Sequence, residues 1–111
     1  MYRNAGQVCL AGTRFLVHEH IAERFVAAMR GHVEKLTVGD PRLDATEVGP
    51  IIHPRPVGRV QGFVDHAVAG GATLLWGGAP HPVGAQYFQP TMVTGLQQTD
   101  EIEQNEVFGP V

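Results

Sequence analysis

The segment that most constrains the fold is a long amphipathic stretch, residues 18–36. Its apolar side chains recur at intervals of four, four, four and three residues, so they lie on one face of a helix. They are Ile21, Phe25, Met29, Val33 and Leu36. Gly39 and Pro41 follow the last turn and act as stop signals. The pattern therefore predicts one long helix early in the chain.

A second helix is predicted to begin near Arg55 or Pro56, because proline is tolerated in a first turn. Its apolar stripe consists of Val57, Val60, Val64 and Val68. Gly58 and Gly62 lie inside it, and each glycine costs about 1 kcal/mol relative to alanine. We therefore expect another backbone to approach the helix at these two positions.

Three segments have the composition of strands: residues 13–17, 72–76 and 87–96, the last containing Pro90 in an edge or unpaired stretch. The pairs Gly70-Gly71 and Gly77-Gly78 are interpreted as helix and strand terminators, because neither belongs to a phosphate-binding motif. The order strand, helix, helix, strand, strand predicts an α/β fold with a partly parallel sheet, since helical crossovers join parallel strands.

Composition narrows the possible partners. Eight Lys and Arg residues stand against eleven Asp and Glu, for a net charge of −3, which argues against nucleic acid. No apolar run approaches the length of a membrane span. One cysteine cannot form an intramolecular disulfide, so a reducing, cytoplasmic setting is expected. The six histidines do not show zinc-site spacing, so no metal site is predicted.

Cys9 is the first candidate for chemistry. It lies within Asn4–Arg14, "NAGQVCLAGTR", where small residues would let a substrate or cofactor come close to the backbone. A tight turn there could aim backbone N–H groups at a developing oxyanion. The alternative is a small buried hydrophobic residue, which a lone cysteine often is. No histidine that could act as a base is near in the sequence.

Glu106 is the second candidate. It lies where an acidic run turns abruptly apolar, in the closing stretch "NEVFGPV". Its carboxylate could accept hydrogen bonds from sugar hydroxyls, and Phe108 could pack on a flat ring. The alternative is a loop that simply enters the core, with a solvated carboxylate at its edge.

These segments resemble the NAD(P)-dependent aldehyde dehydrogenase superfamily. The nucleophile pattern G-Q-x-C-x-A-x-x-R is complete in Gly6, Gln7, Cys9, Ala11 and Arg14, and E-x-F-G-P is complete in Glu106, Phe108, Gly109 and Pro110. Between them, "VGDP" (38–41), "VGPII" (48–52), "GGATLLWGG" (70–78) and "QPTMV" (89–93) look like the family in the same order. The resemblance covers essentially the whole chain.

The resemblance implies roles for three residues. Cys9 would be the catalytic nucleophile, which attacks an aldehyde and passes through a thiohemiacetal and a thioester to the carboxylic acid. Its backbone N–H would be one oxyanion donor. Glu106 would bind the hydroxyls of the nicotinamide ribose of NAD or NADP, and Phe108 would help to position the nicotinamide. Family members are usually homodimers or homotetramers.

The resemblance also implies that residues 1–111 are a partial catalytic domain, with a mostly parallel sheet and flanking helices. The Rossmann-type cofactor domain, the general-base glutamate and the oxyanion asparagine would lie outside the chain, so the isolated chain is expected to be inactive. Both ends look cut from a larger protein. Two alternatives remain: a truncated, non-catalytic interaction module, and a thiol-reactive or redox protein of another class with a preformed thiolate.

Overall fold

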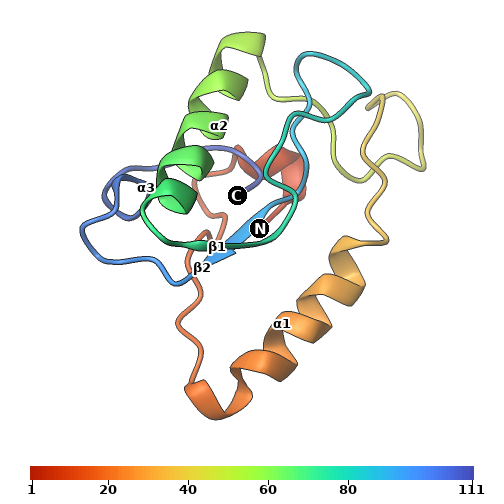
Figure 1. Ribbon diagram of the computed structural model, residues 1–111. Helices are drawn as coiled ribbons and strands as arrows, with labels where there is room; N and C mark the ends of the chain where they lie inside the picture. Colours follow the sequence, from red (N-terminus) through yellow and green to blue (C-terminus); the bar gives the residue numbers. More distant parts are fainter.

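The computed structural model describes all residues, 1–111, and Figure 1 shows the path of the chain. A 3₁₀ turn, η1, opens the chain at Arg3–Gly6. Three α-helices and two strands follow: α1 (Glu19–Val33), α2 (Pro54–Ala69), β1 (Thr73–Trp76), β2 (Met92–Thr94) and α3 (Glu101–Gln104). Both predicted helices are therefore present. No helix is long and apolar enough to cross a membrane.

Helix α2 supplies the largest share of the core. It begins at Pro54, and the Nδ1 atom of His53 caps it by accepting from the N–H of Arg55. Its buried face consists of Val57, Val60, Phe63, Val64 and Ala67. The expected backbone approach at Gly58 and Gly62 is not found, because a Cβ at either position would have no atom of this chain within 4 Å. That side of α2 faces away from the rest of the molecule.

The sheet is a two-stranded antiparallel ladder. The element order predicted a partly parallel sheet and the family resemblance implied a mostly parallel one, so both expectations are wrong for this chain. Thr73 pairs with Thr94, and Leu74 pairs with Val93. The chain returns from β1 to β2 through a loop rather than a helical crossover, and such a return makes neighbouring strands antiparallel. Parallel pairing is limited to one isolated bridge, between Val38 and Val48. The terminator role of the glycine pairs is confirmed: Gly70 caps α2, and Gly77-Gly78 follows β1 with positive φ.

Residues 13–17, predicted as a strand, form no strand. A strand requires a neighbour for its N–H and C=O groups, and neither β1 nor β2 pairs with this segment. Leu16 is fully exposed in consequence. The segment instead lines an open groove together with Leu75, Met92 and the residues around α3.

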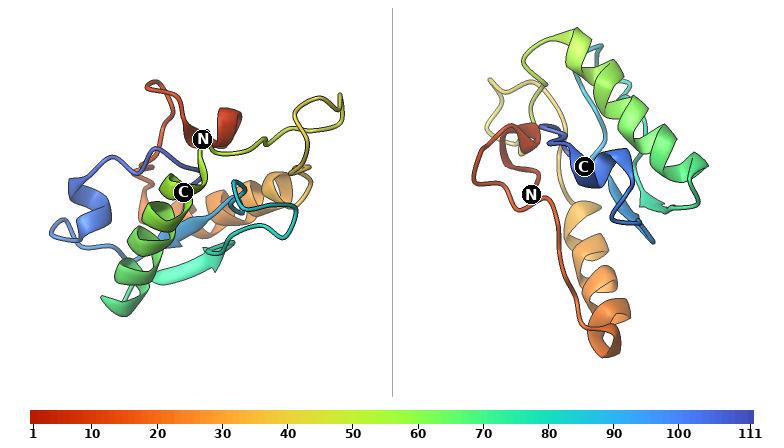
Figure 2. Two further views of the ribbon diagram at one scale, coloured as in Figure 1. Left: turned by 90° about the horizontal axis from the view of Figure 1, so that it is seen from above. Right: turned by 90° about the vertical axis from the view of Figure 1, so that its left-hand side faces the viewer.

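Helix α1 extends away from the rest of the molecule, as Figure 1 and the right-hand view of Figure 2 show. None of its residues is buried, and Ile21 at its start is half exposed. Only the C-terminal end of the apolar stripe, Val33 and Leu36, packs against the core. Arg30 adds a tether, because its Nη2 donates to the carbonyl of Leu75 at 2.7 Å.

The core lies where the two ends of the chain meet α2. The N- and C-terminal residues lie close together in all three ribbon views (Figures 1 and 2). Tyr2 and Ala5 from the first turn and Val107 and Val111 from the last segment belong to one buried cluster with α2. Residues separated by about the whole chain length are thus packed together, and this packing positions the candidate site.

Candidate functional site

The segment before Cys9 has an unusual backbone. Asn4, Ala5 and Gly6 adopt φ angles of 51°, 52° and 71°, three successive residues in the left-handed region. Non-glycine residues adopt this region rarely, at a cost of about 1–2 kcal/mol each, so tertiary contacts must hold it. The turn buries Ala5 and Gly6 and leaves Cys9 exposed in the following turn. Cys9 is therefore exposed in this chain and not buried as a small hydrophobic residue.

Gln7 anchors this segment to the middle of the chain. Its Nε2 donates to the carbonyl of Pro50 at 3.3 Å, and its Oε1 accepts from the N–H of Ile52 at 2.9 Å. The same Nε2 also donates to the carbonyl of Asn4, which closes the turn. Both ends of one amide are thus used, and the glutamine of the nucleophile pattern joins Cys9's loop to the "VGPII" segment.

Gly6 contacts Gly109 backbone to backbone. A Cβ on Gly6 would lie 2.0 Å from the carbonyl oxygen of Gly109 and 2.4 Å from its carbonyl carbon. No side chain larger than hydrogen fits such a contact. The glycine of the first pattern therefore allows the last segment to lie directly against Cys9's loop.

The closing segment alternates between buried and exposed residues. Val107 is buried, whereas Glu106 and Phe108 are exposed, and Phe108 is held at a φ of 52°. Gly109 packs on α2, where a Cβ would lie 2.6 Å from Cγ2 of Val60. The carbonyl of Pro110 accepts from the N–H of Thr91 at 2.8 Å. The Glu106 carboxylate makes no ion pair or hydrogen bond within the chain.

A buried polar network supports the cysteine loop and the closing segment. The hydroxyl of Tyr2 donates to the carbonyl of Thr91 at 2.9 Å and accepts from Nε1 of Trp76 at 3.1 Å. Burial raises the pKa of Tyr2 to about 12, and the Trp76 hydrogen bond opposes that shift. Thr91 is fully buried, and its Oγ1 donates to the carbonyl of Gln89 and accepts from the N–H of Gly78. The network links β1 and β2 to the first turn of the chain.

Two arginines complete the surroundings. Arg14, the last residue of the nucleophile pattern, pairs with Glu103 of α3 at 3.0 Å. Arg59 of α2 donates to the carbonyls of Glu106 and Val107. Arg59 thus binds the chain's own carbonyls. Sequence reasoning missed this role because hydrogen bonds to the backbone leave no mark in a residue pattern.

The thiol of Cys9 has no base in contact with it. It makes no hydrogen bond in the structure, to a histidine or to any other residue. The backbone N–H of Cys9 also has no acceptor within the chain and is available to an external one. The chain thus presents an exposed thiol, a free N–H and a free carboxylate, with the two motifs joined through Gly6 and Gly109.

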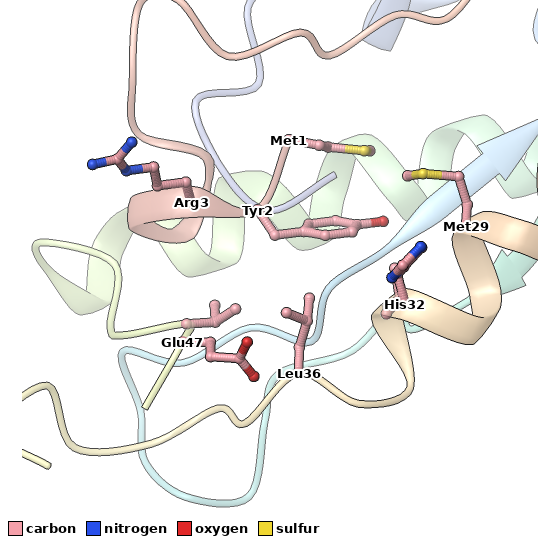
Figure 3. Close-up of a pocket in the computed structure, with 9 residues that line it drawn as sticks. Met1, Tyr2, Arg3, Met29, His32, Leu36 and Glu47 are labelled. Atoms are coloured by element: carbon pink, nitrogen blue, oxygen red, sulfur yellow. The ribbon is translucent and has the colours of Figure 1, made fainter. Parts of the chain in front are cut away.

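A separate cavity of about 360 Å³ lies between the first residues and the end of α1. Figure 3 shows Met29 and His32 of α1 facing Met1 and Tyr2 across it. Its lining is mainly apolar and includes neither Cys9, Glu106 nor Phe108. The cavity is therefore not part of the candidate site.

The segments singled out in the sequence contact one another in space. "VGDP" meets "VGPII" through the Val38–Val48 bridge, and "GGATLLWGG" meets "QPTMV" through the β1–β2 ladder. The first and last motifs meet at Gly6 and Gly109. The segments that carry the family resemblance therefore form one connected structural unit.

Comparisons with known proteins confirm the family resemblance that the sequence patterns indicate. Residues 1–111 match the family model described as the aldehyde dehydrogenase family. A Staphylococcus haemolyticus protein named as an aldehyde dehydrogenase is 42% identical over an alignment of 111 positions, which covers 97% of this chain and 23% of that protein. The mitochondrial succinate-semialdehyde dehydrogenase of Arabidopsis thaliana is 37% identical over 110 residues, which are 99% of this chain and 21% of that protein.

Solved structures show the same likeness. Succinate-semialdehyde dehydrogenase from Burkholderia pseudomallei superimposes with a TM-score of 0.93 at 37% identity, over 98% of this chain and 23% of that one. Betaine aldehyde dehydrogenase from Staphylococcus aureus in complex with NAD⁺ gives 0.90 at 36% identity, over 96% and 22%. These neighbours confirm the α/β class. The chain spans less than a quarter of the length of the relatives it matches.

Proposed function

Because the chain belongs to the aldehyde dehydrogenase family, we propose that residues 1–111 are the nucleophile-bearing part of a catalytic domain that oxidises aldehydes to carboxylic acids with NAD or NADP. The observation that carries the proposal is the backbone contact between Gly6 and Gly109, which joins the cysteine loop to the segment of Glu106 and Phe108. The assembly we propose for the whole enzyme is a homodimer or homotetramer, on the family resemblance.

Cys9 is the nucleophile in this proposal. Its thiolate adds to the aldehyde carbon, a C–S bond forms, and the carbonyl electron pair moves onto oxygen. In the proposal, the N–H of Cys9, which has no acceptor within the chain, donates to that oxygen as one half of an oxyanion hole. In a later step water cleaves the C–S bond of the thioester, which releases the carboxylate and restores the thiolate.

The donor set of the closing segment fits a nicotinamide nucleotide. The carboxylate of Glu106 has no ion-pair partner in the chain. It can therefore accept hydrogen bonds from the hydroxyl groups of a ribose. Phe108 presents an exposed aromatic side chain two residues later, suited to packing on a flat ring. When bound, the nicotinamide supplies the acceptor for the hydride that leaves the thiohemiacetal carbon.

The isolated chain is proposed to be inactive. Its thiol has no base in contact, and the residues that bind most of the cofactor are proposed to lie outside the chain. Mixing the chain with NAD⁺ and an aldehyde is therefore expected to produce no NADH. Formation of NADH by the isolated chain would contradict this part of the proposal.

The activity itself is tested by transplanting the chain. In the graft, residues 1–111 replace the matched segment of the Staphylococcus aureus betaine aldehyde dehydrogenase, over which the two structures superimpose. We expect the graft to reduce NAD⁺ with betaine aldehyde, Cys9→Ala to abolish turnover, and Glu106→Gln to raise the KM for NAD⁺.

A matched control is Glu47→Gln, an exposed carboxylate in the loop between α1 and α2. This change is expected to leave both the KM for NAD⁺ and turnover at the values of the graft. Turnover that survives in the Cys9→Ala graft would contradict the assignment of the nucleophile. An equal KM for NAD⁺ in the Glu106→Gln and Glu47→Gln grafts would contradict the assignment of Glu106.

A further inference from the structure

We infer that Arg59 is a positioning residue for the cofactor site: it fixes the main chain at Glu106 and Val107 and so sets the direction of the Glu106 carboxylate. Its Nη2 donates to the carbonyl of Glu106 at 2.7 Å, and its Nη1 donates to the carbonyl of Val107 at 3.1 Å. One guanidinium thus holds two successive peptide groups. This inference rests on the proposed role of Glu106 in binding the cofactor.

The arginine is itself held in place. Its guanidinium carbon lies 4.7 Å from the centroid of the Phe63 ring, and Phe63 is buried in the core on the same helix. Stacking on an aromatic face restricts the side chain, so less entropy is lost when the two hydrogen bonds form. α2 therefore presents a preorganised pair of donors to the closing segment.

The contacts of Arg59 also leave the carboxylate free. The guanidinium binds the carbonyl of Glu106 but makes no ion pair with its side chain. The side chain of Val107 is buried in the core cluster with α2, whereas its carbonyl accepts from Arg59. Apolar packing and hydrogen bonds therefore both hold the closing segment. Glu106 is exposed, so with the backbone fixed its carboxylate is available to hydroxyl donors.

A fork of two donors is specific to arginine. Its planar guanidinium carries N–H groups in fixed directions, whereas a lysine ammonium is a single point of charge. We therefore expect Arg59→Lys to retain at most one of the two contacts and to behave as an intermediate between the unchanged chain and Arg59→Ala. Arg55, exposed one turn earlier on α2 with no side-chain hydrogen bond, provides the matched control.

The first test measures amide hydrogen exchange in the 111-residue chain itself. Arg59→Ala is expected to speed exchange of the amides of Thr91 and Val111, which donate to the carbonyls of Pro110 and Gly109, by roughly tenfold relative to Arg55→Ala, because local opening of the closing segment no longer has to break the two charge-assisted hydrogen bonds of Arg59. Exchange within β1 and β2 is expected to stay unchanged. Equal exchange in the two variants at Thr91 and Val111, or faster exchange spread over the whole chain, would overturn the inference.

The second test measures kinetics in the graft. Arg59→Ala is expected to raise the KM for NAD⁺ by roughly tenfold, with Arg59→Lys between. The KM for the aldehyde and the alkylation rate of Cys9 are expected to stay within about twofold of the graft. A purely structural role would instead lower the melting temperature and change all the kinetic constants together. That result would overturn the inference.

The failure of this inference and that of the proposed function give different results. If Cys9→Ala abolishes turnover, Glu106→Gln raises the KM for NAD⁺, and Arg59→Ala matches Arg55→Ala, only the positioning role fails. If Glu106→Gln leaves the KM for NAD⁺ unchanged, the proposed cofactor role of Glu106 fails, and the inference fails with it.

Discussion

Gly6 and Gly109 lie so close that a single methyl group between them would fall 2.0 Å from a carbonyl oxygen. They are separated by almost the whole chain, and each belongs to one of the two end motifs. Through this contact the cysteine loop and the segment of Glu106 become one structural element.

Gly6→Ala is expected to destabilise the chain strongly. The substitution places a Cβ against the backbone of Gly109 and forces alanine to a φ of 71°, which alone costs about 1–2 kcal/mol. Urea unfolding followed by circular dichroism measures the change in the free energy of unfolding. Gly12→Ala is the matched control, because its Cβ would meet nothing within 4 Å. Equal stability of the two variants would show that the glycines do not touch.

Thr91→Val is expected to lower the free energy of unfolding by about 1–3 kcal/mol, because the change leaves buried polar groups without partners. Valine has nearly the same shape but cannot accept from the N–H of Gly78 or donate to the carbonyl of Gln89. Thr94→Val, at an exposed strand position, is the control and is expected to change stability little. A Thr91→Val variant as stable as this control would contradict the network.

Because of Tyr2, the free energy of unfolding is expected to fall at alkaline pH. Its pKa is about 12 in the folded chain and 10.0 for an ordinary tyrosine, so between these values the unfolded chain releases the proton first. Stability is complete below pH 10 and falls as pH rises towards 12, by about 2–3 kcal/mol in all. Unfolding at pH 9 and pH 11.5 measures the loss.

The control for this effect is Tyr2→Phe, which has no proton to release. It is expected to be less stable at pH 9, because the contacts with Thr91 and Trp76 are lost. Between pH 9 and pH 11.5 it is expected to lose about 2 kcal/mol less than the unchanged chain, because the loss is not yet complete at pH 11.5. The same alkaline loss in both proteins would contradict the burial of the phenol.

The isolated chain is expected to self-associate. Leu16 is fully exposed beside the open groove, and Ile21 at the start of α1 is half exposed. Exposed apolar surface of this kind favours association. Sedimentation velocity at increasing concentration measures it, and Leu16→Glu is expected to weaken it more than Leu43→Glu, at an exposed leucine in a loop. A monomer at all concentrations would contradict this expectation.

Helices α1 and α2 could be predicted from the sequence because local signals determine them, whereas the short helix α3 was not predicted. Periodicity located α1 and α2, and the glycine pairs correctly marked the ends of α2 and β1. The pairing of strands was less predictable. Residues 13–17 have the composition of a strand, but a strand also needs a partner, and no segment of this chain supplies one.

Residue patterns pointed to a candidate site but gave no guide to its contacts. They proposed Cys9, Glu106 and Phe108, whose roles remain predictions, and the graft tests those of Cys9 and Glu106. The approach of Gly6 to Gly109 and the two donors of Arg59 are long-range backbone contacts, to which residue type gives no guide. The glycines of α2 illustrate the opposite error: Gly58 and Gly62 suggested a close backbone, and this chain provides none.

The nucleophilic role of Cys9 is tested most directly by trapping its acyl product. Trypsin cleaves after Arg3 and Arg14, so the thiol is carried on the peptide Asn4–Arg14. The graft is mixed with betaine aldehyde and NAD⁺, quenched in acid during a single turnover, digested and weighed by mass spectrometry. We predict an acyl group on Cys9 that requires both aldehyde and NAD⁺. An unmodified Cys9 peptide during turnover, or an acyl group on another residue, would contradict the account.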